Sequence, residues 1–513
     1  MSVHNKSVSL FSAVLISMTC MVGSGWLFSA QLGAAQAGNW SFLSWFFAAM
    51  IMISVGLCFS VIVRQFPVRG ATVRASALSH NPIFGMPFAF ANWFAVVVII
   101  ATEAQATTQY LGGVLADRSN LNNILMHNGA LTVDGKLFAL ALLIGYLMIN
   151  YYGVKLLSKI NNVATVFKVF VPLFAVIVFL IAAFTEKQNG STAMTNFHLE
   201  TNNEHYGFFA AIMAIVNAGL LYSFNGFQTI VSYTSEVKKP QRTIPLAIVL
   251  SVLITLGLYM LLQFAFMAAV PHDVLVAKGG WSGLNFGSPL MKLAILLGIN
   301  FLVILLIADS VISPSAAGYT YMGSASRMLY AMSSERQMPG FFAQLHPVHR
   351  ISRRAMWLNF ILASIFLIKA DSWAGLMVIV TGYNIIGYMA APISMGAFAP
   401  QKRWMGAGIF SILSLVLLTL NPSDLRLVVL SLTLVILVYA LTQSAIVSGA
   451  KIFAFILPFV GYLWFEWVIV SLFAVVTTVL ITIITAIIFY WLITMPKFVN
   501  LCQRYRPENV IED

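Results

Sequence analysis

The stretches Gly23-Ser24-Gly25 and Ser223-Phe224-Asn225-Gly226-Phe227 interrupt two long hydrophobic spans, near residues 8–37 and 208–237. Four further apolar spans lie between these two, so each interruption falls in the first helix of a five-helix set. A glycine-rich break at bilayer depth frees backbone N–H and C=O groups that lipid cannot satisfy, and it persists only where protein encloses a cavity. Paired breaks in two halves of a chain are typical of a transporter's substrate site.

The composition indicates an integral membrane protein of many spans, with the lipid bilayer as its surroundings. Of the 513 residues, 60% are hydrophobic and only 9% are charged, whereas a soluble domain has about 25% charged residues. The net charge of +12 comes from Lys and Arg that gather in alternate loops. This pattern predicts that both termini are cytoplasmic. Because no basic soluble face exists, the sequence excludes nucleic acid as a partner.

The hydrophobic spans predict an all-α, multi-span fold. A bilayer-crossing helix needs about 20 apolar residues. Residues 451–495 are too long for one helix, and Glu466 would mark the outer turn between two, which gives fourteen spans. Twelve spans with one flat or re-entrant segment remain the alternative. Ten core spans are expected near 8–37, 40–63, 84–115, 137–153, 161–184, 208–235, 244–270, 289–322, 355–369 and 374–399, followed by 405–420 and 424–446.

The odd number of spans in each half forces an inverted repeat. We therefore expect a 5+5 inverted-repeat transporter core with two to four extra C-terminal helices. The expected domains are a cytoplasmic N-terminus at 1–7, a core at 8–400 with repeats at about 8–184 and 208–400, accessory helices at 401–495 and a cytoplasmic tail at 496–513.

The first break offers backbone N–H groups to a ligand. Gly23 and Gly25 allow the helix to unwind around Ser24, and an outer half-helix would begin near Trp26. The N-terminus of a helix carries a partial positive charge that suits a carboxylate. The alternative is close helix packing by small residues.

The second break offers carbonyl groups instead. Unwinding near Asn225 and Gly226 frees C=O groups that accept hydrogen bonds from an ammonium group. Tyr222, Phe224 and Phe227 provide aromatic faces that either roof a cavity or pack in the core. N–H groups at one break and C=O groups at the other suit a zwitterion, so the predicted substrate is an α-amino acid.

Three motifs occur in order along the chain: Trp26-Leu27-Phe28 after the first break, Ser223-Phe224-Asn225-Gly226-Phe227-Gln228 continuing to Ser235-Glu236-Val237-Lys238-Lys239-Pro240-Gln241-Arg242-Thr243-Ile244-Pro245, and Arg327-Met328-Leu329-Tyr330-Ala331-Met332-Ser333 followed by Met338-Pro339. Over residues 8–400 the chain resembles the amino acid–polyamine–organocation superfamily. The Gly-Ser-Gly-Trp-Leu-Phe form and Ile312-Ser313-Pro314-Ser315-Ala316 resemble its bacterial aspartate–proton symporter branch.

The resemblance implies specific roles at the two breaks. It implies that the Ser24 and Gly25 amides hold the substrate carboxylate. It also implies that the amine is bound by the carbonyls of Met21, Tyr222 and Asn225. Gln228 departs from the acidic residue that many relatives place at that position, which puts proton sensing there in doubt.

Three ionisable residues within spans are candidates for proton coupling, because such residues are costly in a membrane and usually functional. Glu103 either carries the proton, orients the unwound helix or bonds to neighbouring helices. Lys168 appears where the resemblance to proton-coupled relatives implies a coupling lysine, or it extends to the inner surface. Asp309 either pairs with Lys168, serves as the proton site or makes a structural hydrogen bond.

These features predict a secondary active amino acid permease that works by alternating access, with proton-coupled symport favoured. No ATP-binding motif is found, and the sequence predicts no cofactor and no metal site. An exchanger is the alternative within transport, while a sensor, a channel and an enzyme are less favoured. The branch resemblance implies an acidic substrate, but only Lys168 offers a core cation, so a neutral amino acid stays open. The expected location is the bacterial inner membrane.

Overall fold

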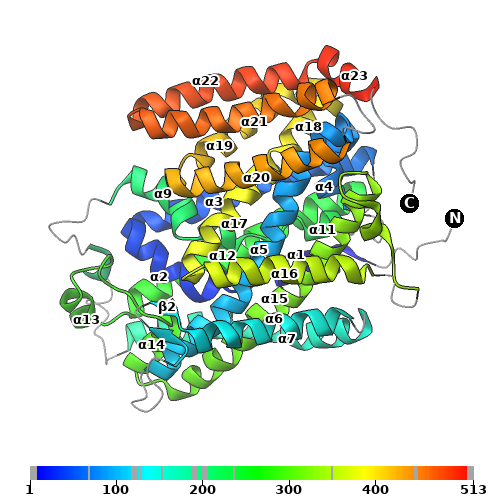
Figure 1. Ribbon diagram of the computed structural model, residues 1–513. Coiled ribbons are helices and arrows are strands. Elements are labelled where there is room, and N and C mark those ends of the chain that lie inside the picture. Colours follow the sequence, from blue (N-terminus) through cyan, green and yellow to red (C-terminus); the bar gives the residue numbers. More distant parts are fainter. Residues whose placement is uncertain are drawn as a thin grey trace.

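The computed structural model describes residues 8–66, 70–116, 124–127, 129–151, 154–185, 195–198, 206–232, 234, 237–347, 351–443 and 449–504. Within these ranges the chain is almost entirely helical, apart from a hairpin of β1 (Met126–His127) and β2 (Ala130–Leu131). Ten of the helical segments in the described ranges are long and apolar enough to cross a membrane. The predicted all-α, multi-span fold is therefore confirmed (Figure 1).

The first five-span set begins with a broken helix. Its helices are α1 (Leu10–Met21), α2 (Gly25–Ala37), α3 (Ser41–Gln65), α5 (Pro82–Ala116), α6 (Val133–Tyr151) and α7 (Val154–Phe184). Between α3 and α5 lies the short buried helix α4 (Ala71–Ser79), and η1 (Gly38–Trp40) links α2 to α3.

The second set also begins with a broken helix. Its helices are α9 (Phe208–Asn217), α10 (Leu220–Ser223), α11 (Thr229–Ser232), α12 (Pro240–Ala269), α15 (Asn300–Ser334), α16 (Arg353–Lys369), α17 (Trp373–Tyr388) and α18 (Ala390–Phe398). The connecting segments hold η2 (Asn196–His198), α13 (His272–Ala277), α14 (Pro289–Leu296) and η4 (Gly340–Ala343).

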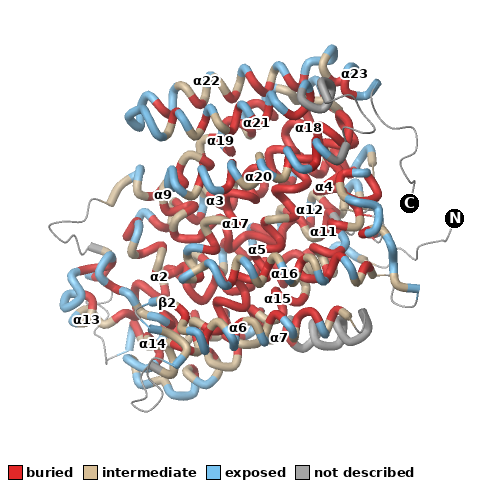
Figure 2. The backbone as a smooth tube through the Cα atoms, viewed as in Figure 1, coloured by how far each residue is buried: buried red, intermediate tan, exposed pale blue. Residues whose placement is uncertain are grey.

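Corresponding helices of the two sets pack on one another, as an inverted repeat requires. Helix α3 packs on α12, and α5 packs on α15. Helix α5 also packs along α17, so it is covered on several sides. Figure 2 shows the buried residues concentrated along α3, α5 and α17. Helices α6, α7 and α22 carry several exposed large apolar residues. This buried centre is where the two breaks meet.

The C-terminal segment adds accessory helices beside the core. They are α19 (Arg403–Leu417), α20 (Pro422–Gln443), α21 (Gly449–Leu472), α22 (Val475–Thr494) and the short α23 (Pro496–Arg504), with η5 (Pro400–Lys402) before them. Residues 451–495 therefore form two helices, as the fourteen-span prediction requires. Helices α21 and α22 lie on the opposite side of the bundle from α6 and α7 (Figure 1).

The prediction that Glu466 marks the turn between these helices is wrong. The turn lies at Phe473 and Ala474, and Glu466 is fully buried within α21. Its carboxyl group accepts hydrogen bonds from Thr482 Oγ1 (2.8 Å) and Thr485 Oγ1 (3.1 Å) of α22. These hydroxyls satisfy a buried polar group that would otherwise need water.

The expected single span at 289–322 is also wrong. The chain breaks at Gly298, whose φ of 72° lies in the left-handed region. Glycine adopts this conformation without a steric penalty. Helix α14 therefore ends at Leu296, and α15 starts afresh at Asn300 and continues to Ser334.

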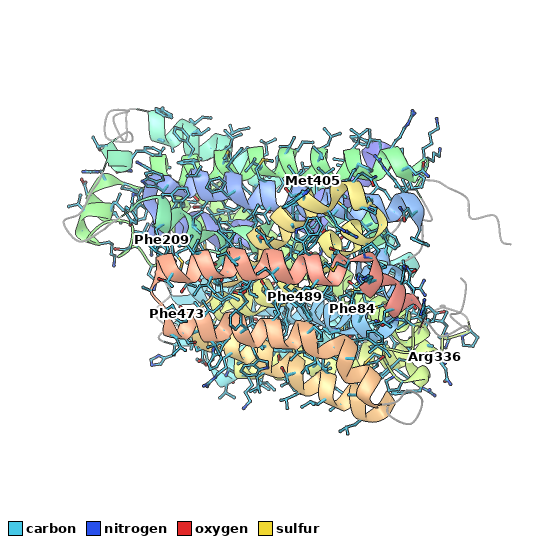
Figure 3. The ribbon with its side chains drawn as sticks, turned by 90° about the horizontal axis from the view of Figure 1, so that it is seen from above. Phe84, Phe209, Arg336, Met405, Phe473 and Phe489 are labelled. Atoms are coloured by element: carbon cyan, nitrogen blue, oxygen red, sulfur yellow. The ribbon has the colours of Figure 1, made fainter. Side chains whose placement is uncertain are left out.

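Different helices lie at the two ends of the bundle. Helices α4, α11 and α23 gather at one end, and α13 and the start of α9 lie at the other (Figure 1). Seen from above, Phe209 and Phe473 lie toward one end and Arg336 toward the opposite end (Figure 3). The site described next lies between these two ends.

Candidate functional site

The first helix is broken where the sequence predicts it. The α1 hydrogen-bond pattern stops after Val22 N donates to Met18 O (3.0 Å), and Gly23 N turns back to Met21 O (3.0 Å). Helix α2 starts at Gly25. The amide of Ser24 therefore lies outside the hydrogen-bond pattern of both helices, at the N-terminal end of α2.

The second helix is broken over a longer stretch than expected. Helix α9 ends at Asn217, and Gly219 has a φ of 71°. A single helical turn, α10, follows before the chain unwinds again at 224–228 and resumes as α11. The break begins before the predicted Ser223 because Gly219 already permits a left-handed residue.

The two breaks lie directly against each other. A Cβ atom on Gly25 would lie 2.5 Å from Ser223 Oγ, and one on Gly226 would lie 2.6 Å from the carbonyl carbon of Cys20. Ser29 Oγ and Ser223 Oγ are hydrogen-bonded at 2.9 Å. The sequence separates these stretches by about two hundred positions, yet only glycine permits their approach.

A carboxylate already occupies the N-terminal end of α2. Glu103 of α5 is buried, and its Oε2 accepts a hydrogen bond from the Ser24 amide (2.9 Å). Its Oε1 accepts one from the Tyr222 hydroxyl (2.8 Å), which comes from the second break. A Cβ atom on Gly23 would lie 2.8 Å from the same Oε1. Glu103 therefore joins both breaks to α5.

The C-terminal end of α1 is held by donors from three other helices. Lys168 Nζ of α7 donates to Thr19 O (3.0 Å), and Tyr321 of α15 donates to Cys20 O (3.3 Å). The hydroxyl of Tyr259 in α12 lies within hydrogen-bond distance of both Met21 O (3.0 Å) and Ser223 O (3.1 Å). A cation at a helix C-terminus is stabilised by the negative end of the helix dipole.

The carbonyls expected to bind the amine are partly engaged. Met21 O accepts from Gly23 N as well as from Tyr259, and Tyr222 O accepts from Asn225 N (2.9 Å). A carbonyl oxygen has two lone pairs. Tyr222 O also receives the Phe224 N–H, so both Tyr222 O and Met21 O would have to exchange a partner to bind a ligand.

Asp309 lies in the same region without forming an ion pair. It is buried in α15, and its Oδ1 accepts a hydrogen bond from Ser313 Oγ (2.7 Å). The Trp26 indole approaches its carboxyl group without meeting hydrogen-bond geometry. No salt bridge joins Asp309 to Lys168 among the described residues, so the pairing that the sequence offered as one alternative is absent.

An aromatic cluster covers the breaks on the side of α2. Trp373, the first residue of α17, donates from Nε1 to Ser24 Oγ (2.9 Å). Its ring stacks on Phe28 (4.7 Å between centroids) and meets Tyr222 edge-on (5.7 Å). Phe224 instead packs against Trp45 and Tyr259. Sequence reasoning missed Trp373, because no local signal places α17 over the first break.

A second layer closes the same end of the bundle. Gln31 of α2 forms paired hydrogen bonds with the backbone of Phe286, from Gln31 Nε2 to the carbonyl (3.2 Å) and from the amide to Gln31 Oε1 (3.0 Å). Ser288 Oγ donates to Tyr110 O at the end of α5 (2.6 Å). The segment before α14 therefore bridges α2 and α5 above the breaks.

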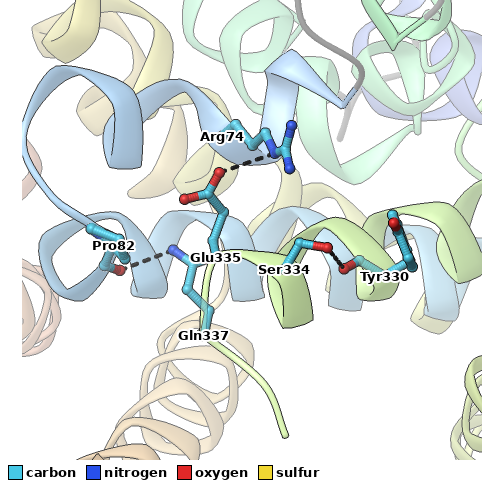
Figure 4. Close-up of polar contacts among 6 residues, drawn as sticks. All are labelled: Arg74, Pro82, Tyr330, Ser334, Glu335 and Gln337. Atoms are coloured by element: carbon cyan, nitrogen blue, oxygen red, sulfur yellow. Dashed lines mark hydrogen bonds and ion pairs between the residues drawn. The ribbon is translucent and has the colours of Figure 1, made fainter. Parts of the chain in front are cut away.

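The opposite end is closed by a buried ion pair (Figure 4). Arg74 Nε of α4 lies 3.1 Å from Glu335 Oε1 at the end of α15, and both side chains are at most 5% exposed. Gln337 Nε2 donates to Pro82 O at the start of α5 (2.9 Å). The described residue Val8 pairs with Val237, which ties the start of α1 to the segment after α11.

Two broken helices that face each other at the centre of an inverted repeat are typical of a secondary transporter with discontinuous helices. Residues 8–501 match the model of the family described as Amino acid permease. The chain belongs to this family, within the amino acid–polyamine–organocation superfamily, and it is a multi-pass membrane amino acid permease.

Three relatives from Bacillus subtilis (strain 168) illustrate the range of the family. The chain is 35% identical over 392 residues to the glutamate/serine transporter AimA, covering 76% of this chain and 71% of the relative. It is 29% identical over 406 residues to the aspartate-proton symporter, covering 78% and 74%. It is 22% identical over 399 residues to the methylthioribose transporter, covering 77% and 78%.

Proposed function

We propose that this permease is a proton-coupled symporter whose substrate binds where the two breaks face each other. The transport core would span 8–400, with repeats at 8–184 and 208–400, and 401–495 would be accessory. The observation that carries the proposal is the hydrogen bond from the Ser24 amide to the Glu103 carboxylate. One relative is named an aspartate-proton symporter, which supports proton coupling.

Glu103 and the substrate compete for the same backbone donor. A substrate carboxylate bound at the Ser24 and Gly25 amides would meet the Glu103 carboxylate at close range in a low-dielectric site, and two like charges there repel strongly. A proton on Glu103 removes this repulsion and weakens its hold on the amide. Substrate and proton therefore bind together, which is the requirement for symport.

The amine of the substrate would bind to backbone carbonyl groups at the two breaks. The carbonyl of Asn225 accepts a hydrogen bond from the ammonium group, and the carbonyls of Tyr222 and Met21 do so once each releases one of its present partners. Lys168 keeps the α1 terminus in place through Thr19 O. A metal cation would have to compete with this ammonium group, which favours protons over sodium.

Orientation completes the proposal. The end that carries α4, α23 and the Arg74–Glu335 pair would face the cytoplasm, because Arg336 lies at this end and Lys and Arg gather on the cytoplasmic side. Both termini would then be cytoplasmic, in a bacterial inner membrane. Transport would leave the amino acid chemically unchanged, so the proposal assigns no catalytic residue.

The test is uptake of radiolabelled amino acids by vesicles that contain the purified protein. Accumulation driven by a pH gradient and indifferent to sodium is expected. Glu103→Gln is expected to abolish gradient-driven accumulation and to retain exchange between substrate inside and outside the vesicles. The matched control is Glu466→Gln, which changes a buried glutamate of α21 and should leave coupling intact.

Three outcomes would contradict the proposal or part of it. Accumulation driven by sodium alone would reject proton coupling. Uptake that requires preloaded amino acid and ignores every gradient would show an exchanger. A Glu103→Gln protein that still accumulates substrate under a pH gradient would move the coupling site to Lys168 or Asp309.

A further inference from the structure

Two side chains of α17 reach the second break from the side. Asn384 Nδ2 donates to Asn225 Oδ1 (3.0 Å), and the Tyr388 hydroxyl donates to the same oxygen (2.9 Å). Asn384 and Tyr388 are four residues apart and lie on one face of α17. Nothing in the sequence alone connects α17 with residue 225, because the two lie about 160 positions apart.

In each of the two asparagine side chains, one polar atom has no hydrogen-bond partner among the described residues. Within the described part of the chain, Asn225 Nδ2 and Asn384 Oδ1 have no hydrogen-bond partner. The two side chains are only 4% and 1% exposed. A buried polar group without a partner costs about 1–3 kcal/mol, and an exception of this kind in a native protein calls for an explanation.

The two groups without a partner are a donor and an acceptor, and they lie on two side-chain amides that are hydrogen-bonded to each other. One is an N–H donor and the other is an oxygen acceptor, so a hydroxyl or carboxamide can satisfy both. A methyl group satisfies neither. A carboxylate can accept from Asn225 but cannot donate to Asn384. It would also be held without a cation, because the Lys168 ammonium is directed to Thr19 O.

The cluster adjoins the place where the breaks meet. A Cβ atom on Gly226, the residue after Asn225, would lie 2.8 Å from the amide nitrogen of Met21. The side chain of Asn225 is therefore one residue away from the contact between the breaks. In the function proposed above, the Asn225 carbonyl binds the substrate's amine, so this cluster includes the side chain of a residue that contacts the substrate.

We propose that Asn225 and Asn384, oriented by Tyr388, form the subsite that reads the substrate's side chain, and that this subsite selects an uncharged hydroxyl or carboxamide over a methyl group or a carboxylate. This inference rests on the substrate position proposed above. It assigns the permease to small neutral polar amino acids such as serine and asparagine.

The experiment measures exchange of radiolabelled serine across vesicles that contain the full chain, with the same pH on both sides. Unlabelled alanine, asparagine and aspartate compete with the tracer. Asparagine is expected to compete about tenfold better than alanine, because alanine leaves both amide groups unpaired. Aspartate is expected to compete less well than asparagine. This ranking uses the unmodified protein and needs no variant to fold.

A variant then links the ranking to the subsite. Asn384→Leu is expected to reduce the preference for serine over alanine about tenfold. The matched control is Asn359→Leu, since Asn359 is an equally buried amide of α16 whose Oδ1 and Nδ2 are both bonded, to Trp93 and Ser326. This control should leave the ratio of serine to alanine unchanged.

The outcomes separate this inference from the proposed function. Aspartate competing better than asparagine, or a folded Asn384→Leu protein with an unaltered ratio, would overturn the subsite and leave symport untouched. Exchange of aspartate without any exchange of serine would do the same. If no amino acid is exchanged at all, the proposed function itself fails.

Discussion

Gly25 is a residue at which one added carbon should stop transport. In Gly25→Ala the new Cβ would lie 2.5 Å from Ser223 Oγ and 3.1 Å from Ser223 Cα. The hydroxyl can rotate away, but the backbone cannot, so α2 must move away from the second break. Overpacking of this kind costs about 1–3 kcal/mol. We expect uptake of every amino acid to be lost, measured in vesicles.

The matched control is Gly408→Ala in α19, where an added Cβ would meet nothing within 4 Å. Its transport should equal that of the unmodified protein. Normal uptake by Gly25→Ala would show that the α2 amides do not bind the substrate.

His80 should make the fold sensitive to mild acid. It lies between α4 and α5, outside the membrane-spanning segments, and its Nε2 donates to Ile493 O (3.0 Å). Burial lowers the pKa of His80 to about 4, although this hydrogen bond opposes the shift. The unfolded chain takes up a proton near pH 6.5. Titration of His80 therefore leaves the free energy of unfolding unchanged above about pH 6.5. The free energy of unfolding then declines as the pH falls toward 4, by up to about 3 kcal/mol.

Thermal unfolding in detergent between pH 7 and 4.5 tests this expectation. His80→Gln removes the titrating group and should flatten the decline over this range. His272→Gln is the control, because His272 is a partly exposed histidine near the other end of the bundle. An identical pH profile for His80→Gln and the unmodified protein would exclude His80 as the cause.

At the scale of helices, the ion pair Arg74–Glu335 joins α4 to the end of α15 (Figure 4). Removing one partner of a buried pair costs about 3 kcal/mol, because the remaining charge stays out of water. We expect Glu335→Gln to lower the unfolding temperature. The double change Arg74→Met with Glu335→Leu should recover most of the loss. A double variant less stable than Glu335→Gln would show that the other contacts of these residues matter more than the pair.

The sequence predicted helices well where the signal is local. Gly23 and Gly25 fix the first break because unwinding needs glycine at those positions. The same reasoning placed the second break too late, since Gly219 was not used. The turn at Glu466 was wrong because hydroxyls that satisfy its carboxyl group come from α22, and pairing between helices leaves no periodic trace. Asn384 and Trp373 were missed for the same reason.

The sequence identified Glu103 as an ionisable residue in a span but left its role open. Its contact with Ser24 depends on how α5 packs across both breaks, which is a property of the assembled bundle. Hydrophobic patterning therefore predicts which segments cross the membrane, whereas the identity of a polar side chain's partner follows only from packing between distant segments.

At the scale of the whole molecule, closure of the two ends must be coupled for alternating access. Contacts at the α2 end stabilise the conformation in which that end is closed. A substitution that removes such a contact shifts the equilibrium toward the conformation that is open at that end, by the free energy that the contact contributes to the closed one. Gln31 contributes to this balance because its paired hydrogen bonds with Phe286 join α2 to the segment before α14, and we expect them to break when that end opens.

Gln31→Leu should therefore shift the protein toward the state that is open at the α2 end. The loss of about 1–2 kcal/mol of hydrogen bonding changes the population ratio about tenfold. Cys20 lies near the end of α1, beside Gly226 of the second break, so a thiol reagent that is added only on the α4 side of a sealed vesicle reaches it only when that end is open. In a protein whose Cys58 and Cys502 are replaced by alanine, we expect a charged thiol reagent to label Cys20 about tenfold more slowly after Gln31→Leu. Gln401→Leu changes an exposed glutamine of η5 and should leave the rate unaltered. Faster labelling after Gln31→Leu would mean that the two ends open together, which alternating access forbids.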